Sequence, residues 1–309
     1  MGYDVVRTSR WSGPDYSLHV FHRQMLQDEV RCRAFQAAIR ATVRPGDTVL
    51  DVGAGTGILS LFAFHAGARM VYAVERTEVA ELARRLVREN GAEDRVQILR
   101  GDMETVQLPE RVDVIVSEWL GSYGVEENML APVVLARDRW LKPDGGLVPA
   151  RVTTWIAPVW DRELEGDLSF WRSLPYGVDL RLVADRKADA LMAPPQPMWT
   201  VDVPRVSYQE SLRPLRATLR ATVSRAGKVS ALAGWFEAEL GDGVVLTNAP
   251  GAPPTHGGTV VFPLRDALEV TEGTTIAIEF VCAPAGPGRT RARWSVRIGD
   301  GPWEHRGNA

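Results

Sequence analysis

The sequence predicts an α/β protein in which a parallel sheet with helices is followed by antiparallel β structure. Two observations support this prediction. Short apolar segments alternate with helical segments from Asp47 to Pro149, which is typical of βαβ units and a parallel sheet. Beyond Pro149, short β-branched segments are divided by proline and glycine, which is typical of an antiparallel sandwich or barrel.

A helical segment precedes both regions. Residues 20–43 place apolar side chains at helical spacing with charged side chains between them, and the letters RPGD then break the helix. We therefore divide the chain into residues 1–45, a helical amino-terminal segment, residues 46–149 and residues 150–309.

The middle region begins with the predicted strand TVLDVG and the predicted helix GILSLFAFHAGA. The strand MVYAVE and the helix EVAELARRLVRENG come next, followed by the segments VQILRGD, VDVIVSE and WLKPDGGLVP. In the last region the predicted strands are RVTTWIAPV, WTVDV, LRATLRATV, ALAGWFEAEL, TVVFPL, TTIAIEFVC and RARWSVRI, interrupted by the helical stretch DLSFWRSLPYGVD.

The composition is that of a globular protein of 309 residues, with 45% hydrophobic and 24% charged residues and a net charge of −3. This charge gives no attraction to nucleic acid or to an anionic membrane, and no apolar run approaches the ~20 residues of a membrane span. Cys32 and Cys282 are far apart, so we expect neither a disulfide nor a cysteine metal site. The expected compartment is the cytoplasm.

A glycine loop between the first strand and helix of the middle region predicts a ligand site. Gly53, Gly55 and Gly57 let the chain turn tightly and let a ligand approach the backbone at the start of a helix. The dinucleotide pattern G-x-G-x-x-G requires a third glycine where this chain has Ile58, so a nucleoside ligand without a pyrophosphate is favoured over NAD. The alternative is a loop that merely turns the chain.

Acidic residues at the next strand ends support the ligand prediction. Glu75 ends the second strand, where a carboxylate accepts hydrogen bonds from ribose hydroxyls. Asp102 and Glu104 end the third strand, where an adenine edge is expected. Because ligands bind at the carboxyl ends of parallel strands, S-adenosylmethionine is the favoured cofactor. An NAD-dependent oxidoreductase is the remote alternative.

Two further glutamates lie in the segment SEWLGSYGVEENML. Glu118 follows a buried strand and Glu127 lies nine residues further on. Such a pair can bind a metal, perform acid–base chemistry or hold a planar cation. A hard metal ion usually needs more oxygen ligands than this segment offers. Two carboxylates fit the forked donors of a guanidinium group, so that role is favoured.

The same segment resembles the double-E loop of the protein arginine N-methyltransferases, which reads S-E-W-M-G followed by E-S-M-L. The resemblance extends to MLQDEVR (residues 25–31), similar to the family's M-L-K-D-E-V-R, and to THGGTVVFPL (residues 255–264), similar to T-H-W-K-Q-T-V-F-Y-L. The segments LDVGAGTGILSLFAFHAGAR, ARDRWLKPDGGLVP and SFWRSLPYGVD also resemble family segments. The matches run from about Tyr16 to the end of the last region.

The resemblance implies a Rossmann-like class I S-adenosylmethionine methyltransferase domain over residues 46–149. An antiparallel β-barrel-like acceptor and dimerisation domain over residues 150–309 follows it, with a helical dimerisation arm at about 163–195. Residues 1–45 then close the cofactor site. The implied partners are an arginine or guanidine-containing acceptor and a second copy of the chain, with S-adenosylhomocysteine as the cofactor product and no metal ion.

The resemblance also implies roles for single residues. Arg31 pairs with the carboxylate of the methionine part of the cofactor, and Glu75 holds the ribose. The remaining cofactor contacts come from His22, Asp51, Gly53, Gly55, Gly57, Met103 and Glu104. Glu118 and Glu127 grip the acceptor guanidinium, and His256 pairs with Asp28 to orient the acceptor side. Tyr16, Met25 and Trp119 shape the acceptor pocket.

One departure from the family pattern concerns the acceptor. Gly257 stands where the family loop has tryptophan, which removes a bulky wall from the acceptor side. The printed sequence also contains no appended domain or Gly/Arg-rich tail that recruits a protein substrate. We therefore favour free L-arginine or a related guanidine metabolite as the acceptor. The alternative is arginine within a polypeptide, and a catalytically silent scaffold is disfavoured because both glutamates are present.

Overall fold

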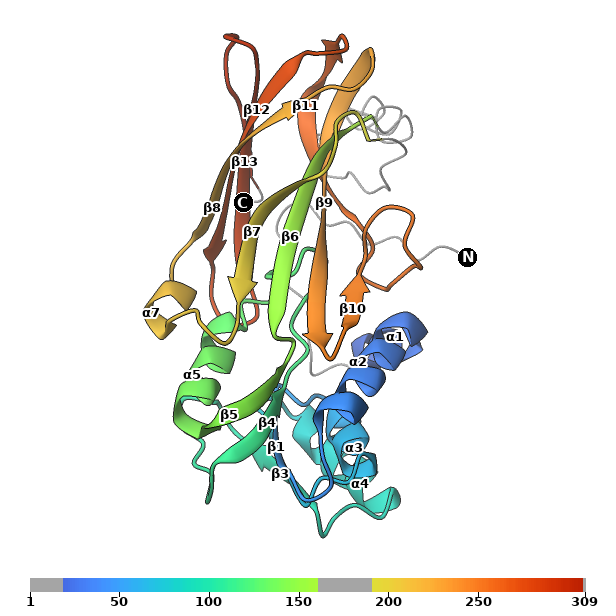
Figure 1. Cartoon of the computed structure of the whole chain (residues 1–309), viewed down its shortest axis with the longest axis vertical. Helices are drawn as coiled ribbons and strands as arrows, with labels where there is room; N and C mark the ends of the chain where they lie inside the picture. Colours follow the sequence, from blue (N-terminus) through green and yellow to red (C-terminus); the bar gives the residue numbers. More distant parts are fainter. Residues whose placement is uncertain (1–18, 161–190, 308–309) are drawn as a thin grey trace, which may run out of the picture.

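The computed structural model of the chain describes residues 19–160 and 191–307. Its parallel sheet and most of its helices form one end of an elongated molecule, and the antiparallel strands form the other (Figure 1). The predicted succession of parallel and antiparallel architectures is confirmed. Tyr16 and most of the predicted arm, including the helical stretch DLSFWRSLPYGVD, lie outside the described residues.

The amino-terminal segment forms two helices, α1 (His19–Gln27) and α2 (Glu29–Thr42). The prediction of one continuous helix over residues 20–43 is therefore wrong. Asp28 leaves the helical conformation (φ −73°, ψ 85°), and its side chain caps α2 by accepting a hydrogen bond from the backbone N–H of Arg31 at 2.9 Å. Such a cap satisfies one of the free N–H groups of a first helical turn. The break thus fixes Asp28 and Arg31 relative to each other.

The parallel sheet has the strand order β3-β2-β1-β4-β5. Its strands are β1 (Thr48–Val52), β2 (Met70–Glu75), β3 (Val96–Arg100), β4 (Val112–Val116) and β5 (Leu141–Val148). The connecting helices are α3 (Ile58–His65), α4 (Val79–Glu89) and α5 (Leu130–Trp140). Apart from Asp51, Asp113 and Thr48, β1 and β4 are apolar, and they are almost fully buried because both faces of a parallel sheet are covered by helices. The loops that follow β1, β2, β3 and β4 therefore meet at one edge of this sheet.

The antiparallel strands form two sheets. One has the order β10-β9-β6-β7, with β11 also paired to β9, and contains β6 (Arg151–Val159), β7 (Gln196–Asp202), β9 (Gly227–Gly241), β10 (Val244–Thr247) and β11 (Val260–Val270). The other, sheet C, has the order β14-β13-β12-β8 and contains β8 (Leu215–Thr222), β12 (Thr275–Pro284), β13 (Thr290–Ile298) and β14 (Glu304–Gly307).

Within the described strands the two sheets do not close into one hydrogen-bonded barrel. The sequence prediction missed the short strands β10 and β14 and the helix α7 (Tyr208–Ser211), which precedes β8. Short elements such as these carry too few residues to show a hydrophobic period.

An aromatic cluster packs between the two antiparallel sheets. The ring of Phe262 lies 4.8 Å from that of Phe280 and 5.1 Å from that of Trp294, measured between centroids. Tyr123, from the segment that carries Glu118 and Glu127, packs edge-on against Phe262 at 5.7 Å. Burial of such aromatic side chains is among the largest apolar contributions to a core. The segment after β4 is thus anchored in the core of the antiparallel half.

Neither cysteine forms a disulfide, as expected: Cys32 and Cys282 are both free. In the part of the chain that the structure describes, no helix is both long and apolar enough to cross a membrane.

Asp51 is a fully buried acid beneath the glycine loop, on the buried strand β1. Its Oδ2 atom accepts a hydrogen bond from the Ser60 hydroxyl at 2.6 Å, and its Oδ1 atom has no hydrogen-bond partner. Burial raises the pKa of Asp51 to about 7, against the opposing effect of the hydrogen bonds from Ser60.

This raised pKa predicts a stability that depends on pH. The unfolded chain releases the Asp51 proton near pH 4, whereas the folded chain holds it up to about pH 7, so the folded state binds more protons between these values. The stabilisation is complete below about pH 4 and is lost as the pH rises through about 7. We expect the free energy of unfolding to fall by roughly 3 kcal/mol between about pH 5 and about pH 8.

Urea unfolding of the native chain and of Asp51→Asn at these two pH values tests the prediction. The variant cannot ionise at this position. Its free energy of unfolding should therefore fall by roughly 3 kcal/mol less than that of the native chain over the same pH change. Other titrating groups are common to both proteins and cancel in the comparison. Equal losses in the two proteins would contradict the assignment.

Candidate active site

A cavity of about 610 Å³ lies at the carboxyl edge of the parallel sheet, between this sheet and the antiparallel half. Its wall contains residues from α1 and α2, the loops after β1, β2, β3 and β4, helix α5, helix α7 and the β12–β13 loop. The predicted site residues that line it are His22, Met25, Arg31, Gly53, Gly55, Glu75, Met103, Glu104, Glu118 and Glu127.

The glycine loop forms one wall of the cavity. Gly55 has a left-handed backbone (φ 54°), and a Cβ atom at this position would lie 3.1 Å from Cε1 of the buried His22. Gly55 donates its backbone N–H to Oε2 of Glu75 at 2.9 Å, and Thr77 donates its N–H to Oε1 of Glu75 at 2.7 Å. These bonds fix the Glu75 carboxylate, and each of its oxygens keeps a further lone pair for a ligand hydroxyl.

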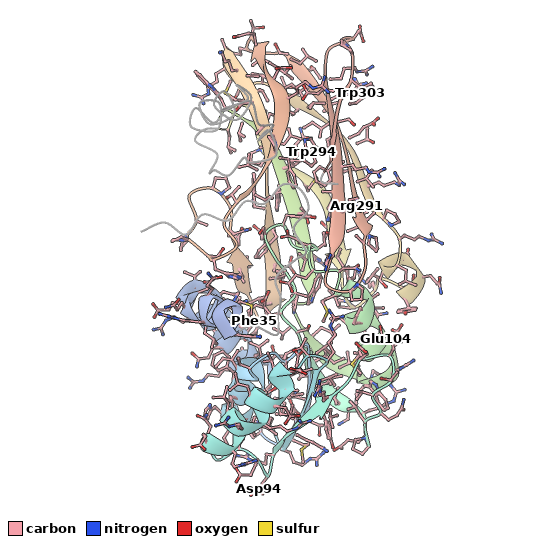
Figure 2. The ribbon with its side chains drawn as sticks, turned by 180° about the vertical axis from the view of Figure 1, so that it is seen from behind. Phe35, Asp94, Glu104, Arg291, Trp294 and Trp303 are labelled. Carbon is pink, nitrogen blue, oxygen red and sulfur yellow. The ribbon has the colours of Figure 1, made fainter. Side chains whose placement is uncertain are left out.

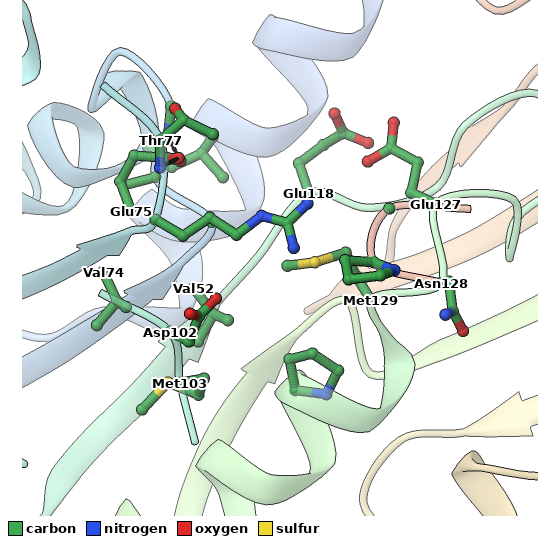
Figure 3. A pocket seen from close by; sticks show the side chains of 18 of the residues that line it. Val52, Val74, Glu75, Thr77, Asp102, Met103, Glu118, Glu127, Asn128 and Met129 are labelled. Atoms are coloured by element: carbon green, nitrogen blue, oxygen red, sulfur yellow. Dashed lines mark hydrogen bonds between the residues drawn. The ribbon is translucent and has the colours of Figure 1, made fainter. Parts of the chain in front are cut away.

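Beyond Glu75, the cavity is lined by Asp102 and Met103, which follow the third strand (Figure 3). Met103 is buried at 4% exposure and supplies an apolar surface, whereas Asp102 and Glu104 are exposed. A carboxylate for the ribose and an apolar surface for a base are the groups that an adenosine moiety needs. The residues present therefore fit S-adenosylmethionine.

Glu118 and Glu127 lie side by side in the same cavity, with their carboxylates turned towards each other (Figure 3). Glu118 is held at both oxygens: Oε1 accepts a hydrogen bond from Leu120 N at 3.0 Å, and Oε2 forms an ion pair with the guanidinium of Arg31. Arg31 also donates to the carbonyl oxygen of Met25 at 2.7 Å. Burial alone lowers the pKa of Arg31, but Glu118, with a smaller contribution from Glu127, raises it above its ordinary value.

The loop that carries both glutamates is fastened to the antiparallel half at several points. Each contact joins a backbone or side-chain group of the loop to a different strand or turn. They are Thr154 Oγ1 to Tyr123 O at 2.8 Å, Thr290 Oγ1 to Glu126 O at 3.1 Å, and Asn128 Nδ2 to Gly286 O at 2.8 Å.

Asn248 connects this loop to the loop that carries His256, and the sequence analysis missed it. Its buried side chain donates from Nδ2 to the carbonyl oxygen of Ser122 at 2.7 Å and to that of Gly258. Its Oδ1 atom accepts the backbone N–H of Phe236 at 2.9 Å. An asparagine after a short strand is a common loop residue, so only its position reveals this role.

His256 and Asp28 form the expected pair. Asp28 Oδ2 accepts from His256 N and lies 2.8 Å from His256 Nδ1, and the Asp28 side chain is fully buried. Burial raises the pKa of Asp28, but the hydrogen bonds from His256 and from Arg31 N outweigh this effect and hold it below its ordinary value. The pair ties the α1–α2 junction to the antiparallel half and lies outside the cavity wall.

Three further predicted residues do not reach the cavity. Asp51 lies beneath the glycine loop and bonds Ser60, Trp119 is fully buried, and Gly57 precedes α3 behind the loop. Within the described ranges, no cluster of three or more His, Cys, Asp or Glu side chains is placed to hold a metal ion.

Gly257 packs directly on the glutamate loop. A Cβ atom at this position would lie 3.1 Å from the carbonyl oxygen of Gly121 and 3.5 Å from Cα of Ser122. Because Gly257 has no side chain, its backbone can pack against the backbone of residues 121 and 122. This contact is an effect of the glycine beyond the loss of a bulky side chain on the acceptor side.

Comparison with known proteins gives matches over most of the chain. The family model of the arginine methyltransferase oligomerization subdomain matches residues 150–297, and the model named PRMT5 arginine-N-methyltransferase matches residues 19–148. Protein arginine N-methyltransferase 6 of Danio rerio is 35% identical over 292 residues, which cover 87% of this chain and 83% of that protein. The chain belongs to the protein arginine N-methyltransferase family.

Other members of this family are similarly close. Protein arginine N-methyltransferase 1 of Chlamydomonas reinhardtii is 35% identical over 286 residues, covering 87% of this chain and 82% of the relative. The solved PRMT1 enzyme–prozyme heterotetrameric complex of Trypanosoma brucei with AdoHcy contains a chain that superposes with a TM-score of 0.83 and 27% identity, covering 95% of this chain and 99% of that one. Arabidopsis thaliana protein arginine methyltransferase 10 gives a TM-score of 0.79 and 28% identity, covering 95% and 97%.

The chain is thus an arginine N-methyltransferase that uses S-adenosylmethionine. The fold expected from the resemblance, a Rossmann-like methyltransferase sheet followed by antiparallel β structure, is confirmed, although the described strands do not close a barrel. The NAD-dependent oxidoreductase alternative is wrong.

The contacts of Asn248 predict that it positions the glutamate loop of this methyltransferase. Asn248→Asp keeps the shape and the acceptor for Phe236 N–H but removes both donors to the loop carbonyl oxygens. Small displacements of catalytic groups have large effects, so we expect turnover to fall about 10- to 100-fold. Cofactor affinity should change less than about twofold, because the glycine loop and Glu75 are not touched.

Turnover and cofactor affinity, the latter by calorimetry, are measured in parallel. The matched control is Asn90→Asp, which changes an exposed amide that bonds only the backbone of its own helix. A parallel loss of turnover and cofactor affinity in Asn248→Asp would indicate general unfolding and contradict a positioning role.

Proposed function

We propose that this methyltransferase acts on arginine residues within polypeptides. Its relatives of 34–35% identity are named protein arginine N-methyltransferases, which favours the polypeptide alternative over the free L-arginine that the sequence analysis preferred. The single observation that carries the guanidinium acceptor is the placement of Glu118 and Glu127 side by side in the cavity that Glu75 and Gly55 also line, and the relatives carry the preference for a polypeptide. The pair of anionic groups therefore faces the space next to the cofactor residues.

On the cofactor side, Glu75 is proposed to hold the ribose and Met103 and Glu104 the adenine. Arg31, His22 and the glycine loop are proposed to contact the methionine part, with Arg31 supplying a positive charge for its carboxylate. When bound, S-adenosylmethionine supplies an electrophilic methyl group on a positively charged sulfur. The domain limits stated above, residues 1–45, 46–149 and 150–309, are part of this proposal.

On the acceptor side, Glu118 and Glu127 are proposed to hold the guanidinium group. This group is always protonated and its charge is spread over three nitrogens, so each nitrogen is a weak nucleophile. Two fixed carboxylates draw the positive charge towards the nitrogens that they contact and leave electron density on the one that reacts. They also orient that nitrogen and offset the repulsion between two cations, so that orientation and electrostatics supply the catalysis.

Methyl transfer assays with labelled cofactor test the proposed acceptor. Free L-arginine, arginine-containing peptides and a cell lysate are supplied separately, and the label is counted in the small-molecule and polypeptide fractions. We expect label in peptides and in lysate protein. Label confined to free arginine would contradict the proposal while leaving the methyltransferase activity intact.

The clamp role of the glutamates gives a second test. Glu127→Gln keeps the shape of the side chain and removes one negative charge, so we expect turnover to fall on the order of 100- to 1000-fold. Cofactor affinity should be retained, because Glu75 and the glycine loop bind the nucleoside. Glu29→Gln, at an exposed glutamate paired with Arg33, is the matched control and should keep full turnover. Normal turnover in Glu127→Gln would refute the clamp.

We also propose a homodimer in the cytoplasm. Residues 150–297 match the family's oligomerization subdomain, which supports self-association. Light scattering at micromolar concentration should give twice the chain mass of 34.1 kDa. A mass equal to one chain would contradict the dimer.

A further inference from the structure

The outer face of sheet C carries a concentration of arginine side chains. Side chains alternate along its strands: Ala217, Phe280 and Trp294 are buried, and their neighbours point outwards. The outward arginines lie on β8 and β13 and are named here the arginine face: Arg216, Arg220, Arg291, Arg293 and Arg297. The first four are exposed.

Strand register places these arginines opposite each other across β12. Val281 of β12 pairs with Arg216 on one side and with Arg293 on the other. Ala277 likewise pairs with Arg220 and with Arg297. The two arginines of each pair lie on β8 and β13, two strand spacings or about 10 Å apart, with an apolar residue of β12 between them.

Few partners within the chain neutralise this face. For Arg216, Arg220, Arg291 and Arg293, the described residues provide no side-chain ion pair or hydrogen bond, and Arg297 stacks over the ring of Trp303 at 4.8 Å. On the outward positions of β8, β12 and β13, Glu279 is the one acidic residue. Five positive charges thus meet one negative charge on a chain whose net charge is −3.

The arginine face begins at the active-site cavity. Helix α7, whose Tyr208 and Ser211 line the cavity, leads directly into β8. The β12–β13 loop, whose Pro287 and Gly288 line the cavity, leads directly into β13. Figure 2 places Arg291 between Glu104, at the cavity, and Trp303 at the far end of the sheet.

The β12–β13 loop also contacts the segment that carries Glu118 and Glu127. Asn128, the residue after Glu127, donates to the carbonyl oxygen of Gly286 in the β12–β13 loop at 2.8 Å. A polypeptide that leaves Glu127 past this contact meets the start of β13 and then Arg291. The cavity and the arginine face are therefore neighbouring parts of one surface.

We propose that the arginine face binds an acidic segment of the protein acceptor, on one side of the arginine that is methylated. This inference rests on the proposed polypeptide acceptor and names its class. Arg291 and Arg297 lie six residues apart along the extended strand β13. An extended acceptor advances by the same ~3.4 Å per residue as a strand, so its acidic residues should occupy a window of about six positions. We place this window at roughly five to eleven positions from the target arginine, because the acceptor must first pass from the cavity across the turn that joins Gly286 to Arg289.

A nucleic acid is the other polyanion that an arginine surface can bind. Single-stranded nucleic acids usually need aromatic side chains between the basic ones for base stacking. The outward positions of β8, β12 and β13 carry no aromatic residue, and the ring of Trp303 is covered by Arg297. The face therefore fits carboxylates better than stacked bases.

Three peptides of equal length test the proposal. Each has one central arginine; one carries glutamates five to eleven residues after it, one carries them before it, and one carries glutamines at all these positions. We expect one of the acidic peptides to have a KM about tenfold lower than the neutral peptide at low salt, with a similar kcat. This advantage should shrink at high salt, because exposed charges are screened.

The matched variants are Arg291→Gln/Arg293→Gln and Arg85→Gln/Arg88→Gln, which remove the same charge from sheet C and from the exposed side of α4. The first should abolish the preference for the acidic peptide and leave the neutral peptide unaffected, and the second should keep the preference. Equal KM values for all three peptides, or loss of preference in both variants, would overturn the inference. A third result would also overturn the inference: single-stranded RNA binds the native chain but not Arg291→Gln/Arg293→Gln, and the native chain shows no preference among the peptides.

The assay separates this inference from the proposed function. If the neutral and acidic peptides are methylated with equal efficiency, the proposed role of the arginine face is wrong and the polypeptide acceptor still stands. Methylation of free arginine and of no peptide overturns the polypeptide acceptor itself.

Discussion

The site depends on holding two carboxylates of like charge in one partly enclosed cavity. Glu118 and Glu127 repel each other, and their loop has little regular structure of its own to resist this repulsion. Arg31 offsets part of the charge through its ion pair with Glu118. The rest of the restraint comes from the antiparallel half, where Asn248, Thr290 and other groups bond the backbone of the loop. The glycine loop and Glu75 belong to the parallel sheet, so the two halves supply different parts of one site.

Much of this arrangement could be predicted from sequence because it follows from strand ends. In a parallel sheet the loops after neighbouring strands meet at one edge, which brings Gly55, Glu75 and Glu118 together once the strands are recognised. The type of each residue then indicates its chemistry. The double-E segment indicated the methyltransferase family, and its two glutamates do line one cavity.

The features that sequence did not predict depend on contacts between distant segments. The resemblance implied the pair of Asp28 and His256, but the helical pattern did not reveal that Asp28 breaks the helix to bond both Arg31 N and His256, which lies 228 residues away. Asn248 bonds backbone carbonyl oxygens, and every residue has such a group, so no residue type in the partner loops signals the contact. The relatives do not support the preference for a small acceptor. That preference relied on what the sequence lacks, and such an absence gives no information about the surface that surrounds the site.

The contact between Gly257 and the backbone of the glutamate loop ties the size of one residue to the position of another segment. A side chain at position 257 would meet the Gly121 carbonyl oxygen at its first carbon, and a main-chain group cannot swing aside as a flexible side chain does. Any larger residue at this position therefore requires a small shift of residues 121 and 122, which lie between Glu118 and Glu127 in the chain. The spacing of the two carboxylates thus depends in part on a residue that carries no functional group.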